Sequence, residues 1–359
     1  MPLFMDIHTV DSEDFSAEDV VKAHMKDLSV QDRFGVRQIK YWVNVQAKTL
    51  FCLMEGPDRE ACNEVHVQSH GQTACNIIEV NDDEFQLFLG EGSRDNTDLA
   101  QTLSGEMDTG YRTLMLVQLL DLAGTGNQIG TELISCVNSN CGNVIPFPGD
   151  LMASFVHASD ALNCSYGVRK IFEQYENRCE YRMALFTGRP VDEVGRELFE
   201  STKKRLDHLC MIGNINKTYV DADTLQLSKK ENMLSEHNSK YLIILSKTAF
   251  NFLEDLFRVI ENKQNQTGFK SHDLHSAMGI SKSQLYRKLK AITDRSPNQL
   301  IQEIKLRNAA QKLNSGAFSV SEVAYDAGFN SPAYFTRAFK SRFGMLPSDY
   351  TKLFDRLKS

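Results

Sequence analysis

The pattern of hydrophobic and polar positions separates an all-helical C-terminal part from a longer part in which strands and helices alternate. In the last hundred or so residues, apolar side chains recur every three or four positions, as amphipathic helices require. The two clearest stripes are Leu285, Leu289 and Ile292, and Phe335, Phe339 and Phe343. Upstream of this part, short apolar runs bounded by polar turns predict strands between the helices.

Each stripe lies in the second helix of a repeated unit of helix, tight turn and helix. The units are Phe269–Thr293 and Phe318–Gly344. Gly279 and Gly328 stand where the chain must turn sharply out of the first helix, a position that favours a residue tolerant of positive φ. A single helix over Ser296–Asn314 joins the units. The pattern therefore predicts a double helix-turn-helix, which is typical of DNA binding.

The outward faces of the second helices carry polar and basic side chains that suit a DNA major groove. Arg in such a groove can pair bidentately with guanine. The outward positions are Lys282, Ser283, Tyr286, Arg287 and Lys290 in the first unit and Asn330, Ala333, Thr336, Arg337 and Lys340 in the second. Ser281 is placed to cap the first of these helices, and Asn330 or Ser331 the second.

The stretch 240–359 resembles the DNA-binding domain of the AraC/XylS family, through SQLYRKLKAITDRSPNQLIQEIKLRNAAQKL and SVSEVAYDAGFNSPAYFTRAFKSRFGMLPSDY. In that family the second helices of the two units enter successive major grooves on one face of the DNA. The resemblance implies base contacts by Ser283, Tyr286 and Arg287, and by Ala333, Thr336 and Arg337. Pro332 departs from the polar residue that is frequent in the family, and Pro offers a base no hydrogen bond.

Charge divides the chain at the same place. Residues 240–359 hold 19 Lys and Arg against 10 Asp and Glu, whereas the first 239 residues hold 21 against 37. A basic segment of net charge +9 therefore follows an acidic body of −16, within a chain of 359 residues and net charge −7. Attraction to phosphates supplies most non-specific affinity for DNA, which makes double-stranded DNA the expected partner.

The pattern of residues 1–82 predicts a compact unit with the order βαββαβ, which is the ferredoxin-like arrangement. PLFMDIHTV, VRQIKYWVNV, KTLFCLMEG and NIIEV have the pattern of strands, and AEDVVKAHMKDLSVQDRFG and DREACNEVHVQSH that of helices. The unit also resembles a small family of nickel-binding ferredoxin-like proteins, through HMKDLSVQDRFGVRQIKYWV, FCLMEGPDREA and VHVQSHGQTACNIIEV.

Four of the nine histidines lie in this unit, namely His8, His24, His66 and His70. His66 and His70 are four positions apart on one predicted helix, so their imidazoles share a face and can reach one metal ion. His8, on a strand expected at the centre of the sheet, joins them if its side chain points toward the helices. Imidazole suits nickel, zinc and copper alike. Two interpretations stay open: a site for nickel or another divalent metal, and histidines without a ligand.

Residues 110–230 predict a second α+β domain. RTLMLVQLLDLAGT begins as a strand, NVIPFPGDLMASFVHASDALNCSYGVRKIFEQY gives a hairpin and a helix, and YRMALFTGRPVDEVG and ELFESTKKRLDHLC follow as strand and helix. The domain resembles the class III nucleotide cyclase homology domain through LLDLAGT, PGDLMASF, MALFTGRPVDEVG and LFEST. In active cyclases two aspartates hold the metal ions that bind the triphosphate, and their places here are Asp121 and Asp150.

The same domain departs from the cyclases in the helix that supplies an Asn and an Arg to the substrate. The matching places here are Lys204 and His208, and an imidazole cannot replace the bidentate fork of Arg. The resemblance therefore implies a degenerate, non-enzymatic domain that binds a small ligand or pairs two chains.

Polar segments at 81–109 and 229–240 are predicted linkers. The chain lacks an 18-residue apolar run, and its N-terminus lacks the basic start and apolar stretch of a signal peptide, so we expect no membrane contact and a cytoplasmic location. The eight cysteines, all before residue 211 and without a CxxC pair, are expected to be free thiols. A redox pair of Cys136 and Cys141 is the alternative.

The sequence thus predicts a multidomain chain of two α+β domains, ferredoxin-like and cyclase-like, followed by an all-α double helix-turn-helix domain. The predicted function is that of an AraC-type, sequence-specific transcription regulator, expected to be a homodimer and controlled by a metal ion or a small-molecule effector at its N-terminal region. Two alternatives remain: a nucleotide cyclase tethered to a DNA-binding domain, and a metal-binding protein whose output is DNA binding.

Overall fold

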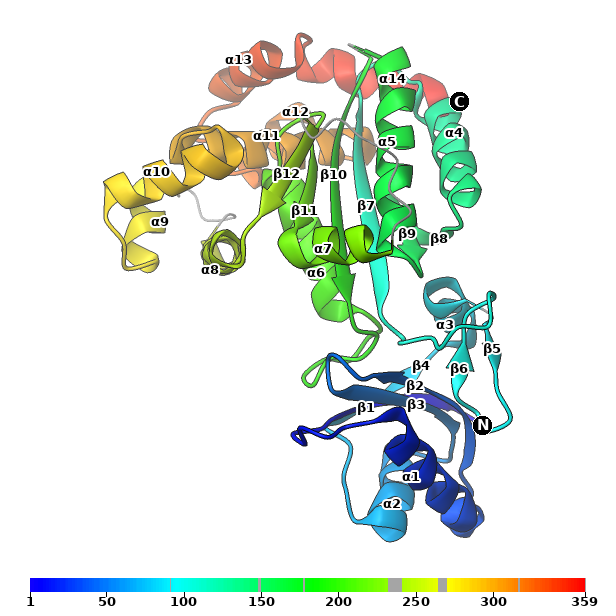
Figure 1. Ribbon diagram of the computed structural model, residues 1–359. Helices are drawn as coiled ribbons and strands as arrows, with labels where there is room; N and C mark the ends of the chain where they lie inside the picture. The colour runs from blue at the N-terminus through cyan, green and yellow to red at the C-terminus, as the bar shows by residue number, and fades with distance from the viewer. Residues whose placement is uncertain are drawn as a thin grey trace.

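Three parts follow one another along the chain in the computed structural model, which describes residues 1–90, 92–147, 150–176, 178–231, 241–263, 270–315 and 317–358. Figure 1 shows a small α+β domain, a central six-stranded sheet flanked by helices, and a group of helices that contains the C-terminus. The predicted start of the first helix-turn-helix unit at Phe269 and the predicted domain start at Lys240 lie outside the described residues.

The N-terminal domain has the predicted βαββαβ order. Its elements are β1 (Leu3–Thr9), α1 (Ala17–Val30), η1 (Gln31–Phe34), β2 (Arg37–Asn44), β3 (Thr49–Glu55), α2 (Arg59–His70) and β4 (Asn76–Val80). The strands form an antiparallel sheet in the order β2-β3-β1-β4, so β1 is central as expected. Helices α1 and α2 cover one face of this sheet (Figure 1).

The two-residue period of β1 sends successive side chains to opposite faces of the sheet. Met5 and Ile7 belong to the core on the face away from α1 and α2. Phe4 belongs to the core under these helices, and Asp6 and His8 share its face. A carboxylate and an imidazole therefore lie beneath α1 and α2, where burial requires that they be paired.

The segment 81–109 is not the linker that its polar composition predicted. It contains α3 (Asp82–Leu89) and a hairpin of β5 (Ser93–Arg94) and β6 (Ala100–Gln101). Phe85, Phe88 and Leu89 recur with helical spacing and are buried, so α3 packs as part of the core. The apolar stripe outweighs the acidic first turn of this helix, which the composition had emphasised.

The middle domain holds a six-stranded sheet. Its elements are β7 (Arg112–Asp121), α4 (Gly126–Ser139), β8 (Asn143–Phe147), β9 (Asp150–Phe155), α5 (Ala158–Gln174), β10 (Cys179–Gly188), α6 (Glu200–Ile212), β11 (Thr218–Asp221), α7 (Ala222–Lys230) and β12 (Leu242–Leu245). The order is β12-β11-β10-β7-β9-β8. The four strands β10-β7-β9-β8 repeat the ferredoxin-like arrangement of the first domain, and β11 and β12 extend it in parallel.

The predicted hairpin, the two strands and the helices at α5 and α6 are present, whereas α4 was not predicted. Met115 and Val117 of β7 face α4 and α5, and Leu114 and Leu116 face α6. Both faces of β7 are therefore buried, which explains its continuous apolar run. The predicted linker 229–240 begins inside α7, and residues 232–240 lie outside the described part of the chain.

The C-terminal part is all helical, as predicted. Its helices are α8 (Lys247–Lys263), α9 (Ser271–Ala277), α10 (Lys282–Thr293), α11 (Pro297–Ser315), α12 (Val320–Asp326), α13 (Pro332–Phe343) and α14 (Pro347–Lys358). Gly279 and Gly328 have φ angles of +62° and +75°, which confirms both turns. The hydroxyls of Ser281 and Ser331 cap α10 and α13. No helix among the described residues is long and apolar enough to cross a membrane.

Candidate functional site

The helix α10 exposes the side chains that were predicted to contact DNA in the first helix-turn-helix unit. Lys282, Ser283, Tyr286 and Arg287 are all exposed, while Leu285 and Leu289 are buried. This is the arrangement that the hydrophobic spacing predicted. The exposed face is polar and basic, as a helix that enters a major groove requires.

The helix α13 presents the second unit in the same way. Asn330, Ala333, Arg337 and Lys340 are exposed and Thr336 is half-buried, whereas Phe335, Phe339 and Phe343 are buried. Pro332 is in the first turn of the helix, where a missing N–H costs no intrahelical hydrogen bond. Within the described chain, neither Arg287 nor Arg337 forms an ion pair, so both guanidinium groups face solvent.

Arginines of the two helix-turn-helix units and of the helix between them contact β10 and α6 of the middle domain. Arg342, in the last turn of α13, contacts Glu180 of β10 at 2.8 and 2.7 Å. Arg307 of α11 donates to the carbonyl of Cys210 in α6 at 3.0 Å. Arg295, directly after α10, donates to the carbonyl of Ile212 at 3.2 Å. These contacts leave the exposed faces of α10 and α13 uncovered.

The candidate metal centre lies between the N-terminal sheet and helices α1 and α2. Asp6 Oδ2 is 2.8 Å from His66 Nε2 and 3.2 Å from His8 Nε2. Asp27 Oδ2 is 3.2 Å from His66 Nδ1, and Asp27 Oδ1 is 3.4 Å from His70 Nε2. Three histidines from a strand and a helix therefore converge on two aspartates.

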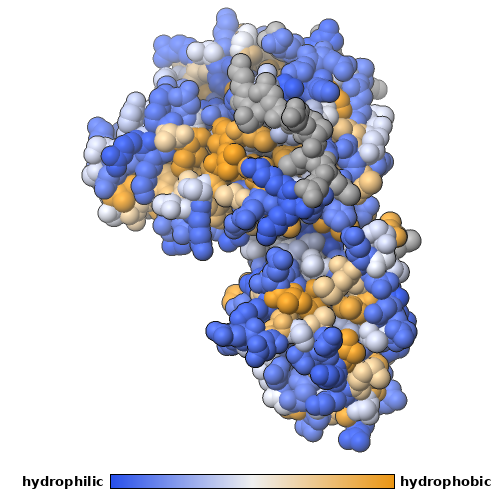
Figure 2. Space-filling model, in the orientation of Figure 1, coloured by the Kyte–Doolittle hydropathy of each residue, from blue (hydrophilic) through white to orange (hydrophobic). Residues whose placement is uncertain are grey.

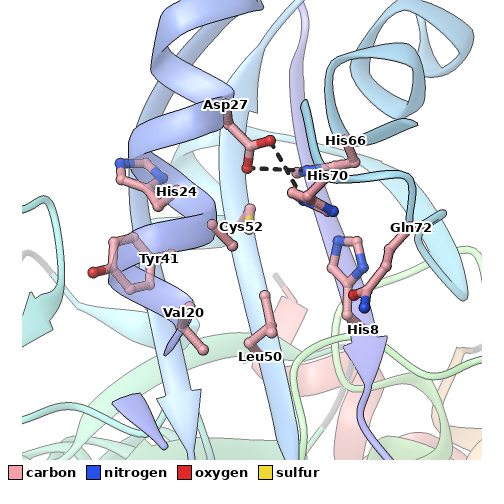
Figure 3. Close-up of a pocket in the computed structure, with 11 residues that line it drawn as sticks. His8, Val20, His24, Asp27, Tyr41, Leu50, Cys52, His66, His70 and Gln72 are labelled. Atoms are coloured by element: carbon pink, nitrogen blue, oxygen red, sulfur yellow. Dashed lines mark hydrogen bonds and ion pairs between the residues drawn. The ribbon is translucent and has the colours of Figure 1, made fainter. Parts of the chain in front are cut away.

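The donor atoms of these side chains are close enough to share one ion. Candidate ligand atoms of Asp6, His8, Cys52 and His66 all lie within 4.8 Å of one another, and so do those of Asp27, His66 and His70. A cavity of about 40 Å³ lies beside them, which has room for an ion or a water molecule. Figure 3 shows His66, His70 and His8 along one wall of this pocket and His24 beside Tyr41 on the other.

The electrostatics of the centre are dominated by His66 and its two aspartates. Burial alone would lower the pKa of His66, but hydrogen bonds to Asp27 and Asp6 raise that pKa to about 10. Burial opposes ionisation of Asp6, yet the neighbouring His8 and the hydrogen bond from His66 lower its pKa. Burial lowers the pKa of His70. The two carboxylates thus favour the protonated form of His66, which lies between them.

The structure brings together three of the four histidines that the sequence singled out. His24 lies across the pocket, and its Nε2 is 3.2 Å from Asp98 Oδ2. Its Nδ1 is buried without a hydrogen-bond partner among the described residues, and so is Nδ1 of His70. Both nitrogens lie in or beside the pocket, and a bound ligand would give them the partner that a buried polar atom requires.

Sequence reasoning missed the acidic and thiol members of the centre, Asp6, Asp27 and Cys52. Asp6 stands two residues before His8 on one strand, so the strand period places both on the face beneath the helices. Asp27 stands three residues after His24 in α1. The spacing of Asp6 and His8 could therefore have been recognised in the sequence. Cys52, in contrast, reaches the centre only because β3 pairs with β1.

The two aspartates of the cyclase resemblance, Asp121 and Asp150, have different partners in the structure. Asp121 accepts backbone hydrogen bonds from Ala123, Gly124 and Gly126 at 2.8 to 2.9 Å, so its carboxylate fixes the turn into α4. Burial raises the pKa of Asp150 to about 7, and its charged neighbours Arg307 and Asp207 lie on the opposite side of the sheet from α4.

The other two positions of that resemblance hold α8 in place. Lys204 Nζ and His208 Nε2 lie 3.5 and 2.9 Å from the carboxylate of Glu261. The ring of His208 also stacks on Phe257 at 4.1 Å between centroids. Both side chains therefore have partners within the fold.

Known protein families match a segment near each end of the chain. A family model described as a helix-turn-helix domain matches residues 274–353, and one described as a nickel responsive protein, SCO4226-like, matches residues 4–80. The solved structure of SCO4226 from Streptomyces coelicolor A3(2) is 33% identical and covers 22% of this chain and 94% of its own, with a TM-score of 0.21.

Two curated relatives match parts of this chain. The histidine kinase P4 of Formosa agariphila is 33% identical over 116 residues, 32% of this chain and 8% of the kinase. The thermoregulatory protein LcrF of Yersinia pestis is 24% identical over 208 residues, 57% of this chain and 69% of LcrF. Residues 274–353 therefore belong to a double helix-turn-helix domain, which together with the curated relatives supports a DNA-binding transcription regulator, and residues 4–80 are similar to the SCO4226-like family.

Proposed function

We propose that this chain is a sequence-specific transcription regulator in which a divalent metal ion at the N-terminal domain controls the affinity of the double helix-turn-helix for DNA. The observation that carries the metal part is the convergence of Asp6, His8, Cys52 and His66 within 4.8 Å. Nickel is the first candidate, because the family model that matches this domain is described as nickel responsive.

The donor set of the centre suits this class of metal. Imidazole and thiol ligands favour nickel, copper and zinc over magnesium and calcium, which prefer oxygen alone. His8, His66 and His70 would supply imidazole nitrogens, and Cys52 a sulfur. The aspartates Asp6 and Asp27 would balance the charge of the ion. A bound metal would supply a fixed positive charge that ties β1, α1 and α2 together.

Contacts between domains offer a route from the metal centre to the DNA-binding part. Thr9, next to His8, donates to Glu193 at 3.2 Å, and the amide of Asn76 donates to the carbonyls of Asp192 and Gly195 at 2.8 and 3.0 Å. The loop that carries Asp192, Glu193 and Gly195 follows β10, whose other end holds the DNA-binding domain through Arg182 and Glu180. We propose that metal binding shifts this loop and, through β10, the placement of α11 and α13.

The test is the affinity of the full chain for labelled DNA from its own upstream region, with Ni²⁺ added and after chelation. We expect a several-fold change in affinity. The variant His8→Ala/His70→Ala should lose this response and keep the affinity of the metal-free protein. The matched variant His157→Ala, whose imidazole lies in the middle domain, should respond like the wild type.

Two other outcomes would redirect the proposal. Metal uptake that leaves DNA affinity and oligomeric state unchanged would make the N-terminal domain a metal buffer. Absence of uptake of Ni²⁺, Zn²⁺ and Cu²⁺ in equilibrium dialysis would overturn the metal part and move the search for an effector to the middle domain.

For the middle domain we propose a degenerate cyclase-like fold that supports a homodimer or binds a small ligand. The different partners of Asp121 and Asp150 and the contacts of Lys204 and His208 with Glu261 support a role without catalysis. Turnover of ATP or GTP with Mn²⁺ that is lost in Asp121→Ala would contradict this, and sedimentation velocity of the full chain tests the dimer.

A further inference from the structure

A pair of thiols in the middle domain belongs to neither candidate site. Cys136 of α4 and Cys164 of α5 lie with their sulfur atoms 3.9 Å apart. The Cys136 thiol is also 3.8 Å from the carbonyl oxygen of Cys164. Cys141, the partner that sequence spacing suggested for Cys136, is exposed after the end of α4. The fold therefore brings Cys136 to a residue 28 positions away.

A glycine in α5 makes this approach possible. Gly167 lies in the interior of the helix, where Gly costs roughly 0.5–1 kcal/mol relative to Ala. A Cβ atom at this position would lie 2.5 Å from the Cys136 sulfur, which is too close for any contact between unbonded atoms. The absence of a side chain at Gly167 thus lets α4 and α5 pack at the distance that the two thiols need.

The two thiols differ in exposure and in acidity. Cys136 is partly exposed, whereas Cys164 is completely buried. The hydrogen bond from Cys164 lowers the pKa of Cys136, and the same contact, together with burial, raises the pKa of Cys164. The accessible member of the pair is thus the better nucleophile, and the buried member is placed to react with it afterwards.

We propose that Cys136 and Cys164 are a redox modification site, which hydroperoxides convert into a reversible disulfide between α4 and α5. The Cys136 thiolate attacks one peroxide oxygen and the O–O bond breaks, which gives a sulfenic acid. The leaving hydroxide (or alkoxide) takes up the proton that the Cys136 thiol had lost and departs as water (or alcohol). The Cys164 sulfur then attacks the sulfenic sulfur, the S–O bond breaks, and a second water leaves with the thiol proton. Two thiols are oxidised by two electrons and one peroxide is reduced. The sulfurs close from 3.9 Å to about 2.05 Å.

The experiment maps the disulfide in the full chain after treatment with hydrogen peroxide. Trypsin leaves Cys136, Cys141 and Cys164 on one peptide, because no Lys or Arg lies between Arg112 and Arg169. Cleavage after acidic residues separates them, since Asp150 and Asp160 stand between Cys136 and Cys164. We expect fragments 133–150 and 161–173 to be joined, with two of the eight thiols lost and both restored by dithiothreitol.

Two variants assign the sulfur atoms. In Cys141→Ser the joined fragments should form as in the wild type, and in Cys136→Ser they should be absent. Joined fragments in Cys136→Ser would assign the disulfide to Cys141 and overturn the proposal. Peroxide treatment of the wild type that leaves all thiols free, or oxidises Cys136 alone to sulfinic acid, would overturn it as well. Cys136 is partly exposed and Cys141 is exposed, so both variants are expected to fold. Near-UV circular dichroism checks this.

Discussion

Arg342 and Glu303 form the centre of the contact between the DNA-binding domain and the six-stranded sheet. Arg342 Nε is 2.6 Å from Glu303 Oε2, and Nη2 is 2.8 Å from Oε1. Arg182 of β10 contacts the same carboxylate at 2.5 Å. Since Glu303 belongs to α11 and Arg342 to α13, a single carboxylate joins the second helix-turn-helix unit to β10, the strand that runs toward the N-terminal domain.

We predict that Glu303→Gln destabilises the chain strongly. The carboxylate is only 7% exposed, and its removal leaves the buried guanidinium of Arg182 without a counter-charge. Loss of one partner of a buried ion pair costs roughly 3–5 kcal/mol. Urea unfolding measures the change in free energy. The control Asp326→Asn breaks the exposed pair with Lys312 and should cost less than about 1 kcal/mol. Equal costs for the two variants would contradict this account.

The same carboxylate predicts a pH dependence of stability. Burial would raise the pKa of Glu303, but hydrogen bonds and the charges of Arg342 and Arg182 lower it from 4.5 to about 2. A group whose pKa is lower in the folded state adds stability above its unfolded pKa, and this stability disappears as the pH falls through the folded pKa. The difference in unfolding free energy between wild type and Glu303→Gln should therefore shrink between pH 4.5 and pH 2. A constant difference over this range would show that the charge is not its source.

The sequence predicted those parts of the fold that depend on local periodicity. The stripe of Phe335, Phe339 and Phe343 and the positive φ of Gly328 follow from side-chain spacing and turn chemistry alone, and both were found. Helix α3 was missed because three consecutive acidic residues at its start suggested a linker. Helix α3 forms because Phe85 and Phe88 are buried against the rest of the fold, and the amino-acid composition of the segment does not reveal that burial.

The candidate metal centre was predictable only in part, for a related reason. His66 and His70 lie on one helix, so a rule of spacing finds them. Asp27 and Cys52 come from a different helix and a different strand, and only the packing of α1 and the pairing of β3 bring them to His66. The placement of α11 against β10 through Glu303 is likewise a contact between distant segments that periodicity does not encode.

For DNA recognition we predict that Arg287→Ala and Arg337→Ala each weaken binding to the specific site by roughly 1–3 kcal/mol and relax the base preference at one position. Both guanidinium groups are exposed on the outward faces of α10 and α13. Binding to a panel of single-base variants of the site measures both effects. Arg258→Ala, an exposed arginine of α8, is the control and should leave the base preference unchanged. A uniform loss across all sequences would assign Arg287 and Arg337 to phosphate contacts.

Metal binding should also stabilise the N-terminal domain. A ligand that binds only the folded state adds about 2.7 kcal/mol at 100 times its dissociation constant. We expect Ni²⁺ to raise the thermal midpoint of the full chain and chelation to reverse this. His70→Ala, which removes a half-buried member of the cluster, should reduce the shift, whereas His157→Ala should not. An equal shift in both variants would place the metal elsewhere in the chain.

If the proposed metal response passes through the contact between the N-terminal domain and the loop after β10, a variant in this contact should separate metal binding from DNA binding. In Asn76→Ala the two hydrogen bonds to the carbonyls of Asp192 and Gly195 are lost, while every ligand of the candidate centre remains. Calorimetry should therefore give an unchanged affinity for Ni²⁺, and the ratio of DNA affinities with and without Ni²⁺ should fall toward one. Asn44→Ala, which removes a turn contact to Ala47 in the same domain, should keep the full ratio. If Asn76→Ala also kept the full ratio, the signal would have to pass through α3 instead. Phe88 of this helix stacks on Phe199, which is another contact between α3 and the middle domain.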